Sequence, residues 1–194
     1  QKGENMKKIS IISLLFITTL FLASFTALAQ NEGELLQSAL SSYQAGDLNA
    51  SQEALEKARL LLWNKAPMKM VNPVFTEGEA QSYGYYTKRL SNFFAADEKL
   101  FVYVEPKNYT IREESGTFHI YFTVDFNVYD TEGNFIGGQE SFSDFRYVTA
   151  SPVFEVFLVT TLNFDLEPGD YIVEIICRDK FSDKKASFKL PFKK

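Results

Sequence analysis

The sequence predicts an α+β protein in which an N-terminal helical hairpin precedes an antiparallel β-sandwich. Apolar residues recur with a period near four early in the chain and with a period of two later. A short apolar segment before the helices has the features of a secretory signal. The expected organisation is an upstream extension at 1–5, a signal peptide at 6–29, the hairpin at 30–65, a connector at 66–80 and the sandwich at 81–194.

The segment before Gln30 is predicted to be removed on export. Two lysines are followed by an apolar stretch from Ile9 to Leu22 and by the small-residue cleavage site Ala27-Leu28-Ala29. The stretch is shorter than the roughly 20 residues of a transmembrane helix, although a retained anchor is the alternative. Lys2-Gly3-Glu4 can be encoded by a purine-rich run that resembles a bacterial ribosome-binding site, so translation is expected to start at Met6. We therefore expect a periplasmic or extracellular bacterial protein without a membrane span after cleavage.

Charge argues against a nucleic-acid partner. Without Lys2, Lys7, Lys8 and Glu4 of the first 29 residues, 17 of the 20 basic and 24 of the 25 acidic residues remain, a formal charge of −7. An acidic chain of this kind lacks the basic surface that nucleic acids and anionic membranes require.

Apolar residues at helical spacing predict two helices between positions 32 and 63. Gly46 is suited to the left-handed end of the first helix, and Asp47 can accept the free N–H groups of the second. The stretch from Tyr43 to Ala58 resembles a tetratricopeptide repeat, with Gly46 and Asp47 at the turn and Ala58 late in the second helix. Because stacked repeats need about three copies and this chain has one, we expect the hairpin to pack its apolar face on the sandwich.

Alternation of apolar and polar residues predicts the strands. The clearest runs from Thr117 to Tyr129 and leads through a turn at 130–134 to Phe135 and Ile136. About seven or eight short strands separated by turns are typical of a two-sheet sandwich. The other predicted strands are Gln81–Thr87, Lys99–Val104, Ser141–Val148, Val153–Phe164, Asp170–Arg178 and Lys185–Pro191.

A turn containing Gly169 leads into a strand that begins with Tyr171. This arrangement resembles the tyrosine corner of immunoglobulin-like domains, in which the phenol binds backbone upstream, and it implies an immunoglobulin-like sandwich. The whole chain resembles uncharacterised exported bacterial proteins that have one tetratricopeptide-like hairpin before such a domain. Cys177 shares a face of the same strand with Tyr171, and we expect it to be a buried small hydrophobe. It is the only cysteine, so no internal disulfide can form.

The sequence contains no recognisable catalytic or metal-binding motif. One histidine, His119, and one cysteine cannot supply the ligands of a zinc site. The oxygen-rich stretch Asp130–Asn134 is too short for a helix-loop-helix calcium site, which favours a plain turn. We expect no enzyme, metal or cofactor, although the many carboxylates among the strands leave a hydrolase as a less favoured alternative.

Tyrosines form the most distinctive candidate surface. Tyr83 and Tyr85 would share a face of the strand predicted at 81–87, and Tyr103 and Tyr121 would complete an aromatic platform if they lie outside. Such rings suit sugars or a protein partner, whereas the alternative is that they are covered by the hairpin. We expect a non-enzymatic module that binds another envelope or secreted protein. The alternative function is a module that binds carbohydrate or the cell envelope through these tyrosines.

Overall fold

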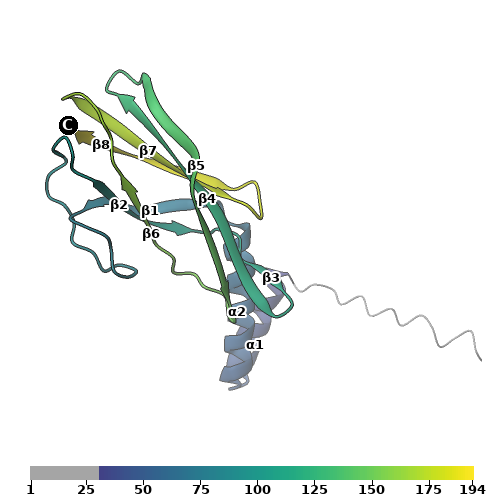
Figure 1. Ribbon diagram of the computed structural model, residues 1–194. Helices are drawn as coiled ribbons and strands as arrows, with labels where there is room; N and C mark the ends of the chain where they lie inside the picture. The colour runs from purple at the N-terminus through teal and green to yellow at the C-terminus, as the bar shows by residue number, and fades with distance from the viewer. Residues whose placement is uncertain (1–30) are drawn as a thin grey trace, which may run out of the picture. The chain divides into compact units, whose positions relative to one another are not determined.

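The computed structural model describes residues 31–194 as two helices and two antiparallel sheets, which confirms the predicted α+β class (Figure 1). The predicted extension and signal peptide lie outside the described residues. In chain order the elements are α1 (Glu32–Gln44), α2 (Leu48–Lys65), β1 (Lys69–Thr76), β2 (Leu100–Lys107), β3 (Arg112–Glu114), β4 (Thr117–Asp130), β5 (Phe135–Thr149), β6 (Leu158–Leu162), β7 (Asp170–Asp179) and β8 (Lys185–Lys193). Within the described part, no helix is long and apolar enough to span a membrane.

The two helices are joined by a short turn that the sequence specifies locally. Gly46 has a φ of +80°, and the carboxylate of Asp47 accepts an N–H from the first turn of α2 at 3.0 Å. The Oγ of Ser51 donates to the carbonyl oxygen of Ala39 at 2.9 Å across the helix pair. The seam between the helices is filled by small buried residues: Ala39, Ser51, Ala54 and Ala58. These side chains allow the two backbones to approach closely.

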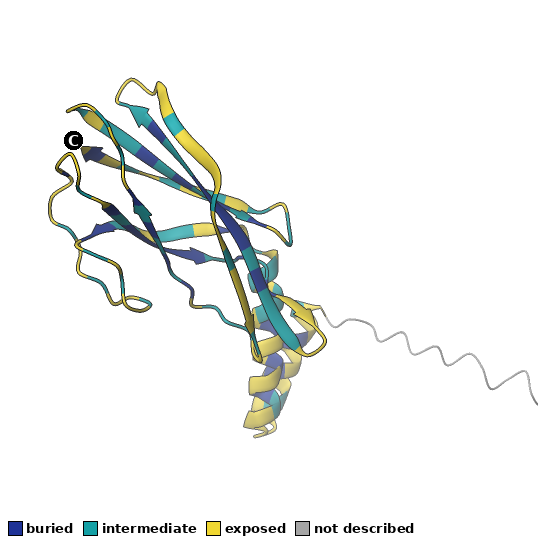
Figure 2. Ribbon diagram, in the orientation of Figure 1, coloured by how far each residue is buried: buried dark blue, intermediate teal, exposed yellow. Residues whose placement is uncertain are grey.

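The two sheets enclose one hydrophobic core. The smaller sheet has the order β1-β2-β6, and the larger has the order β3-β4-β7-β8, with β5 also paired to β4. Figure 2 shows the buried residues concentrated on the facing strands of the two sheets. Alternate residues of β2, β4 and β7 supply much of the core: Val102, Val104, Ile120, Phe122, Val173, Ile175 and Cys177. Burying each large side chain of this kind contributes about 1.5–3 kcal/mol.

Several segments differ from the sequence-based prediction: β3 was not predicted, and β5 is one strand where two were expected. The expected connector at 66–80 contains β1, where Pro73 lies at an irregularity of the ladder beside Asn72, whose φ is +55°. An irregularity tolerates a residue that has no N–H to donate. The strand predicted at 81–87 is instead a tight turn, because Gly84 has a φ of +69° and only Ser82 and Tyr85 form a bridge. In the predicted strand at 153–164, only the residues of β6 are paired with β2.

Tyr171 has the geometry expected of a tyrosine corner. Its hydroxyl donates to the carbonyl oxygen of Glu167 at 2.8 Å, four residues upstream. Gly169 lies under the ring, and a Cβ at this position would be 3.3 Å from two atoms of the Tyr171 side chain. The backbone of Gly169 also exchanges two hydrogen bonds with Lys194, at 2.9 and 3.0 Å. The turn before Tyr171 is therefore joined to Lys194, the residue after β8.

We predict that Tyr171→Phe lowers the free energy of unfolding by about 1 kcal/mol, because the carbonyl of Glu167 loses its donor. Urea denaturation followed by circular dichroism measures this change. Tyr85→Phe is the matched control, since Tyr85 is 66% exposed on the turn at 81–87. Equal stabilities of the two variants would show that the corner contributes nothing.

Candidate functional site

The four candidate tyrosines do not form a common surface. Tyr103 is fully buried on β2, and Tyr83 is turned towards the buried carboxylate of Glu105. Tyr85 is 66% exposed on the tight turn, whereas Tyr121 lies on β4 in the other sheet. The predicted platform was wrong because the conformation of Gly84 breaks the extended strand on which two of the tyrosines would have shared a face.

Glu105 organises a cluster of polar groups beneath the turn at 81–87. Its two carboxylate oxygens accept hydrogen bonds from Tyr83 at 2.7 Å and Tyr103 at 2.9 Å, and Lys107 Nζ lies 3.7 Å away. The hydroxyl of Tyr103 also accepts the N–H of Gly84 at 2.8 Å. These contacts attach the turn to the outer face of the small sheet and leave no oxygen of Glu105 unpaired.

The cluster perturbs the titration of its own members. Burial acts to raise the pKa of Glu105, but hydrogen bonds from Tyr83, Asn72 and Tyr103, with the charge of Lys107, outweigh it and lower this pKa. Burial and the adjacent carboxylate raise the pKa of Tyr83 to about 12. Burial is also the largest cause that raises the pKa of Tyr103 to about 12. At neutral pH the cluster is therefore one carboxylate held by neutral phenols and a lysine, which is a structural arrangement.

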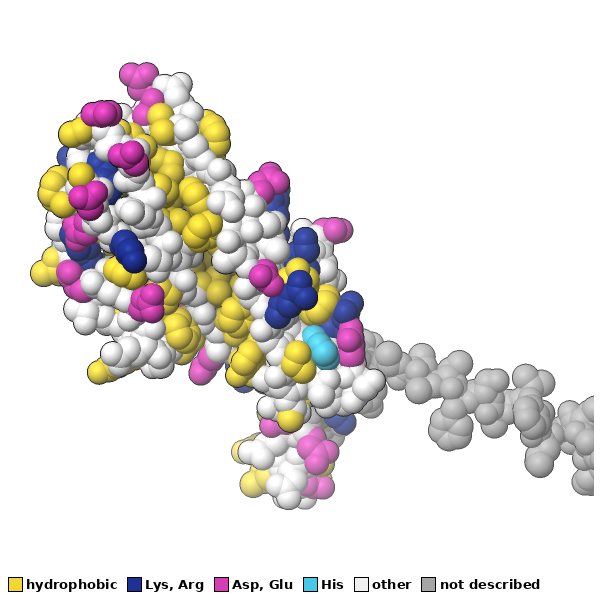
Figure 3. Space-filling view, viewed as in Figure 1, with side chains coloured by type: hydrophobic (Ala, Val, Ile, Leu, Met, Phe, Trp, Pro, Cys, Tyr) yellow, Lys and Arg dark blue, Asp and Glu magenta, His cyan; other side chains and the backbone are white. Residues whose placement is uncertain are grey.

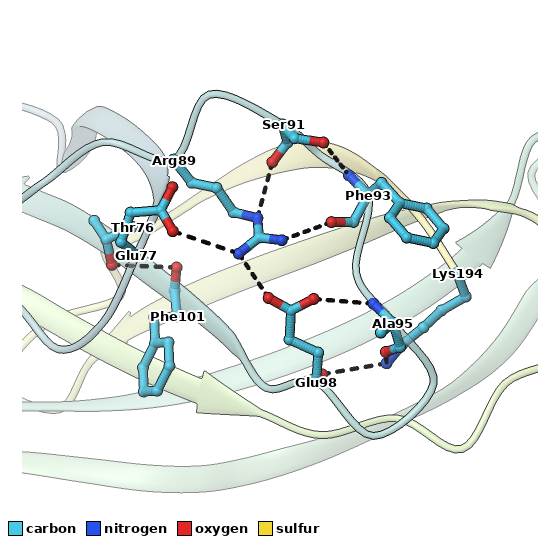
Figure 4. A network of polar contacts seen from close by, with 9 residues as sticks. All are labelled: Thr76, Glu77, Arg89, Ser91, Phe93, Ala95, Glu98, Phe101 and Lys194. Atoms are coloured by element: carbon cyan, nitrogen blue, oxygen red, sulfur yellow. Dashed lines mark hydrogen bonds and ion pairs between the residues drawn. The ribbon is translucent and has the colours of Figure 1, made fainter.

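A second polar network fixes the segment at 89–98 (Figure 4). The Arg89 guanidinium binds the carboxylate of Glu98 at 2.7 Å and the carbonyl oxygens of Ser91 and Phe93 at 3.0 and 2.7 Å. The N–H of Ala95 donates to Glu98, and this bond is the largest cause that lowers the pKa of Glu98. These groups bind one another, so the network secures a loop. Sequence reasoning missed both networks because nothing in the spacing of their members indicates that they meet.

The remaining residues considered for chemistry lie in the core, on a strand and in a turn. Cys177 is fully buried, and this burial raises the pKa of its thiol, which removes it as a nucleophile. His119 Nε2 lies 2.9 Å from the hydroxyl of Thr117. Asp130 accepts backbone N–H groups of Glu132 and Asn134, as a turn requires. Within residues 31–194, no group of three His, Cys, Asp or Glu side chains is placed to hold a metal ion.

The helix pair carries a large apolar surface, which we call the helical face. It consists of Leu36, Leu40 and Tyr43 on α1 and Leu48, Leu55 and Leu62 on α2, each between 45% and 65% exposed. The spacing of four, three and seven residues places each set in one stripe along its helix. Figure 1 shows the helices extending beyond one end of the sheets, and Figure 3 shows hydrophobic side chains at their surface.

The helical face was expected to pack on the sheets, and it does not. Contact with the core is made near the end of α2 by Leu60 and Trp63. The Trp63 ring lies edge-on to the rings of Tyr109 at 5.2 Å and Phe154 at 5.1 Å. Asn64 is also anchored, because its side chain exchanges two 2.9 Å hydrogen bonds with the backbone of Ile111. The helices are therefore held at one end, while the leucine stripes stay open.

A groove with a volume of about 450 Å³ lies where the helical face meets this junction. It is lined by Leu36, Leu55, Ala58, Arg59, Leu62, Trp63, Ala66 and Asn108. Arg59 is the only charged residue of this lining, and its Cζ lies 3.8 Å from the centre of the Phe154 ring. The groove can accept an apolar side chain beside a fixed positive charge.

Comparisons with known proteins do not assign a function. The sequence matches no protein-family model and no curated protein. The function must therefore be inferred from the side chains and surfaces of the molecule. The helical face contains every exposed large hydrophobic side chain of α1 and α2, and it adjoins the groove.

Proposed function

We propose that this protein is an exported, non-enzymatic module that binds another protein through the helical face. The observation that carries the proposal is the pair of leucine-rich stripes, whose six side chains are 45–65% exposed. Single exposed apolar residues are common, but a contiguous apolar patch marks an interaction site. The signal features of residues 6–29 support a location in the periplasm or outside the cell.

In this proposal the helices form a hairpin of the tetratricopeptide type, and the sheets form an immunoglobulin-like sandwich. The turn at Gly46 and Asp47 supports the first assignment. The hydrogen bond of Tyr171 to the backbone supports the second. The sandwich then serves as a rigid base that holds the hairpin at its Trp63 end and presents the helical face to the partner.

The occupant that fits the helical face is an amphipathic α-helix of a partner protein. Lys65 at the end of α2 binds Glu32 at the start of α1 at 2.6 Å, so the two helices are antiparallel. Leu36 of α1 lines the same groove as Leu55 and Leu62 of α2, so the two stripes lie on one side of the helix pair. Two adjacent stripes leave a furrow that a third helix fills with apolar residues three and four positions apart. Backbone groups of α1 and α2 are already paired within the helices, so an extended peptide would gain no ladder hydrogen bonds there.

Trp63 provides a direct test, because it lines the groove and is the only tryptophan. We predict that a tryptophan-free amphipathic peptide of about 18 residues, or five turns, changes the Trp63 fluorescence saturably. Leu55→Glu and Leu62→Glu should each weaken this binding at least about tenfold, since a charge would have to be buried. Lys57→Glu is the matched control, because Lys57 is exposed on α2 outside the groove lining and the helical face.

Circular dichroism melting must show that the leucine variants remain folded, which their exposure predicts. Affinity capture from the native envelope should then recover the same protein with the unchanged chain and with Lys57→Glu, and lose it with Leu55→Glu. Equal peptide binding by all variants would refute the proposal. Sedimentation that shows a dimer broken by Leu55→Glu would also refute it, because a second copy would then occupy the face.

A further inference from the structure

We infer that the partner helix carries a carboxylate beside its apolar stripe and that this carboxylate binds Arg59. The inference depends on the proposed function and names the chemistry of the partner at the same surface. It assigns Arg59 as the specificity-determining residue of the groove.

Arg59 differs from the other arginines of residues 31–194. Arg89, Arg112, Arg146 and Arg178 each form an ion pair with a carboxylate of the chain, at 2.5 to 3.0 Å. Within the same residues, Arg59 forms none, and its Cζ lies 3.8 Å from the centre of the Phe154 ring. A guanidinium has five N–H donors, and stacking on an aromatic ring occupies its face and leaves its edge free.

The position of Arg59 in the groove allows the free edge of its guanidinium to bind a partner. Seven other residues line the groove, and all of them are uncharged, so a partner seated there excludes water from around the guanidinium. The attraction between opposite charges strengthens as water is removed, and a carboxylate matches the guanidinium edge with two parallel hydrogen bonds. Stacking on Phe154 holds the plane of the group before the partner arrives, which reduces the entropy lost on binding.

The indole nitrogen of Trp63 does not contribute to this recognition. The indole Nε1 of Trp63 is the one buried side-chain nitrogen or oxygen in residues 31–194 without a hydrogen-bond partner. This nitrogen is closed to solvent, so the edge of the Arg59 guanidinium is the donor that the groove presents to a partner. A partner with a carboxylate complements this group, whereas a basic partner does not.

The test uses the full exported chain and pairs of tryptophan-free helical peptides with identical leucine stripes. In each pair one flank position carries Glu or Gln, and a panel of pairs moves that position along successive turns. We expect one Glu peptide to bind about 5–10-fold more tightly than its Gln counterpart at low salt, which is the range of a charged pair at an interface. Arg59→Gln should abolish this preference, and high salt should reduce it.

Arg112→Gln is the matched control. Its guanidinium also stacks on a ring, with Cζ 3.8 Å from the centre of Phe181, but it pairs with Glu114 and does not line the groove. This variant should keep the preference for the Glu peptide. Arg59→Lys should keep only part of it, because an ammonium lacks the two-pronged edge.

The outcomes distinguish a failure of the inference about Arg59 from a failure of the proposed function. If Glu and Gln peptides bind equally along the whole panel and Arg59→Gln has no effect, the inference is wrong, while the helical face remains a binding site. If no peptide changes the Trp63 fluorescence, the proposed function fails as well. A melting temperature of Arg59→Gln equal to that of the unchanged chain shows that any lost preference comes from the missing guanidinium.

Discussion

Replacing Trp63 by alanine is expected to lower the free energy of unfolding by about 3–5 kcal/mol. The ring packs against the hydrophobic core and lies edge-on to Tyr109 and Phe154, so its removal opens a cavity between the helices and the sheets. The measurement is urea denaturation followed by circular dichroism, since the variant has no tryptophan fluorescence. For a chain of this size, the melting temperature should fall by roughly 10 °C.

The same variant should loosen the helices from the sheets. Amide hydrogen exchange in α2 should become faster than in β4 and β7, because only the packing of Leu60 and the Asn64–Ile111 hydrogen bonds remain as the main anchors. Trp63→Phe should cost less than the alanine change, since it keeps most of the packing and removes an indole N–H that has no partner. Leu55→Ala is the control on α2 and should cost less than about 1 kcal/mol, because Leu55 is 47% exposed.

Replacing Glu105 by glutamine is expected to cost about 2 kcal/mol at pH 7, because two phenols lose a charged acceptor. The folded-state pKa of Glu105 lies below its unfolded value. Its ionised form therefore stabilises the fold fully above about pH 4.5, and this contribution is lost as the pH falls through the folded-state pKa. The stability difference between the two proteins should consequently shrink below pH 4.5.

Urea denaturation at a series of pH values between 7 and 3 measures this difference. Glu113→Gln is the control, because Glu113 is exposed on β3 and its replacement should change stability by less than about 0.5 kcal/mol at pH 7. If the deficit of Glu105→Gln stays constant across the series, the ionisation of Glu105 is not linked to folding. The turn that carries Tyr83 should also exchange its amide hydrogens faster in Glu105→Gln.

Much of the secondary structure could be predicted because its signals are local. The alternation of β4 and the two residues Gly46 and Asp47 act through the shape and hydrogen bonding of their own segments. The turn before Tyr171 is also local, since its phenol binds backbone four residues upstream. The prediction was wrong where a local pattern had two interpretations. Tyr83 and Tyr85 are spaced like residues of a strand, but Gly84 between them forms a turn. Pro73 indicated a connector, but it lies at an irregularity within β1.

The sequence by itself determined the α+β class, the positions of both helices and the absence of a recognisable catalytic motif. Only the tertiary structure decided that Tyr103 is buried, that the leucine stripes stay exposed and that Arg59 has no carboxylate partner within residues 31–194. The physical reason is that periodicity shows that an apolar face exists but not what covers it. Covering depends on residues distant in the chain, and the helices here meet the core at one end only.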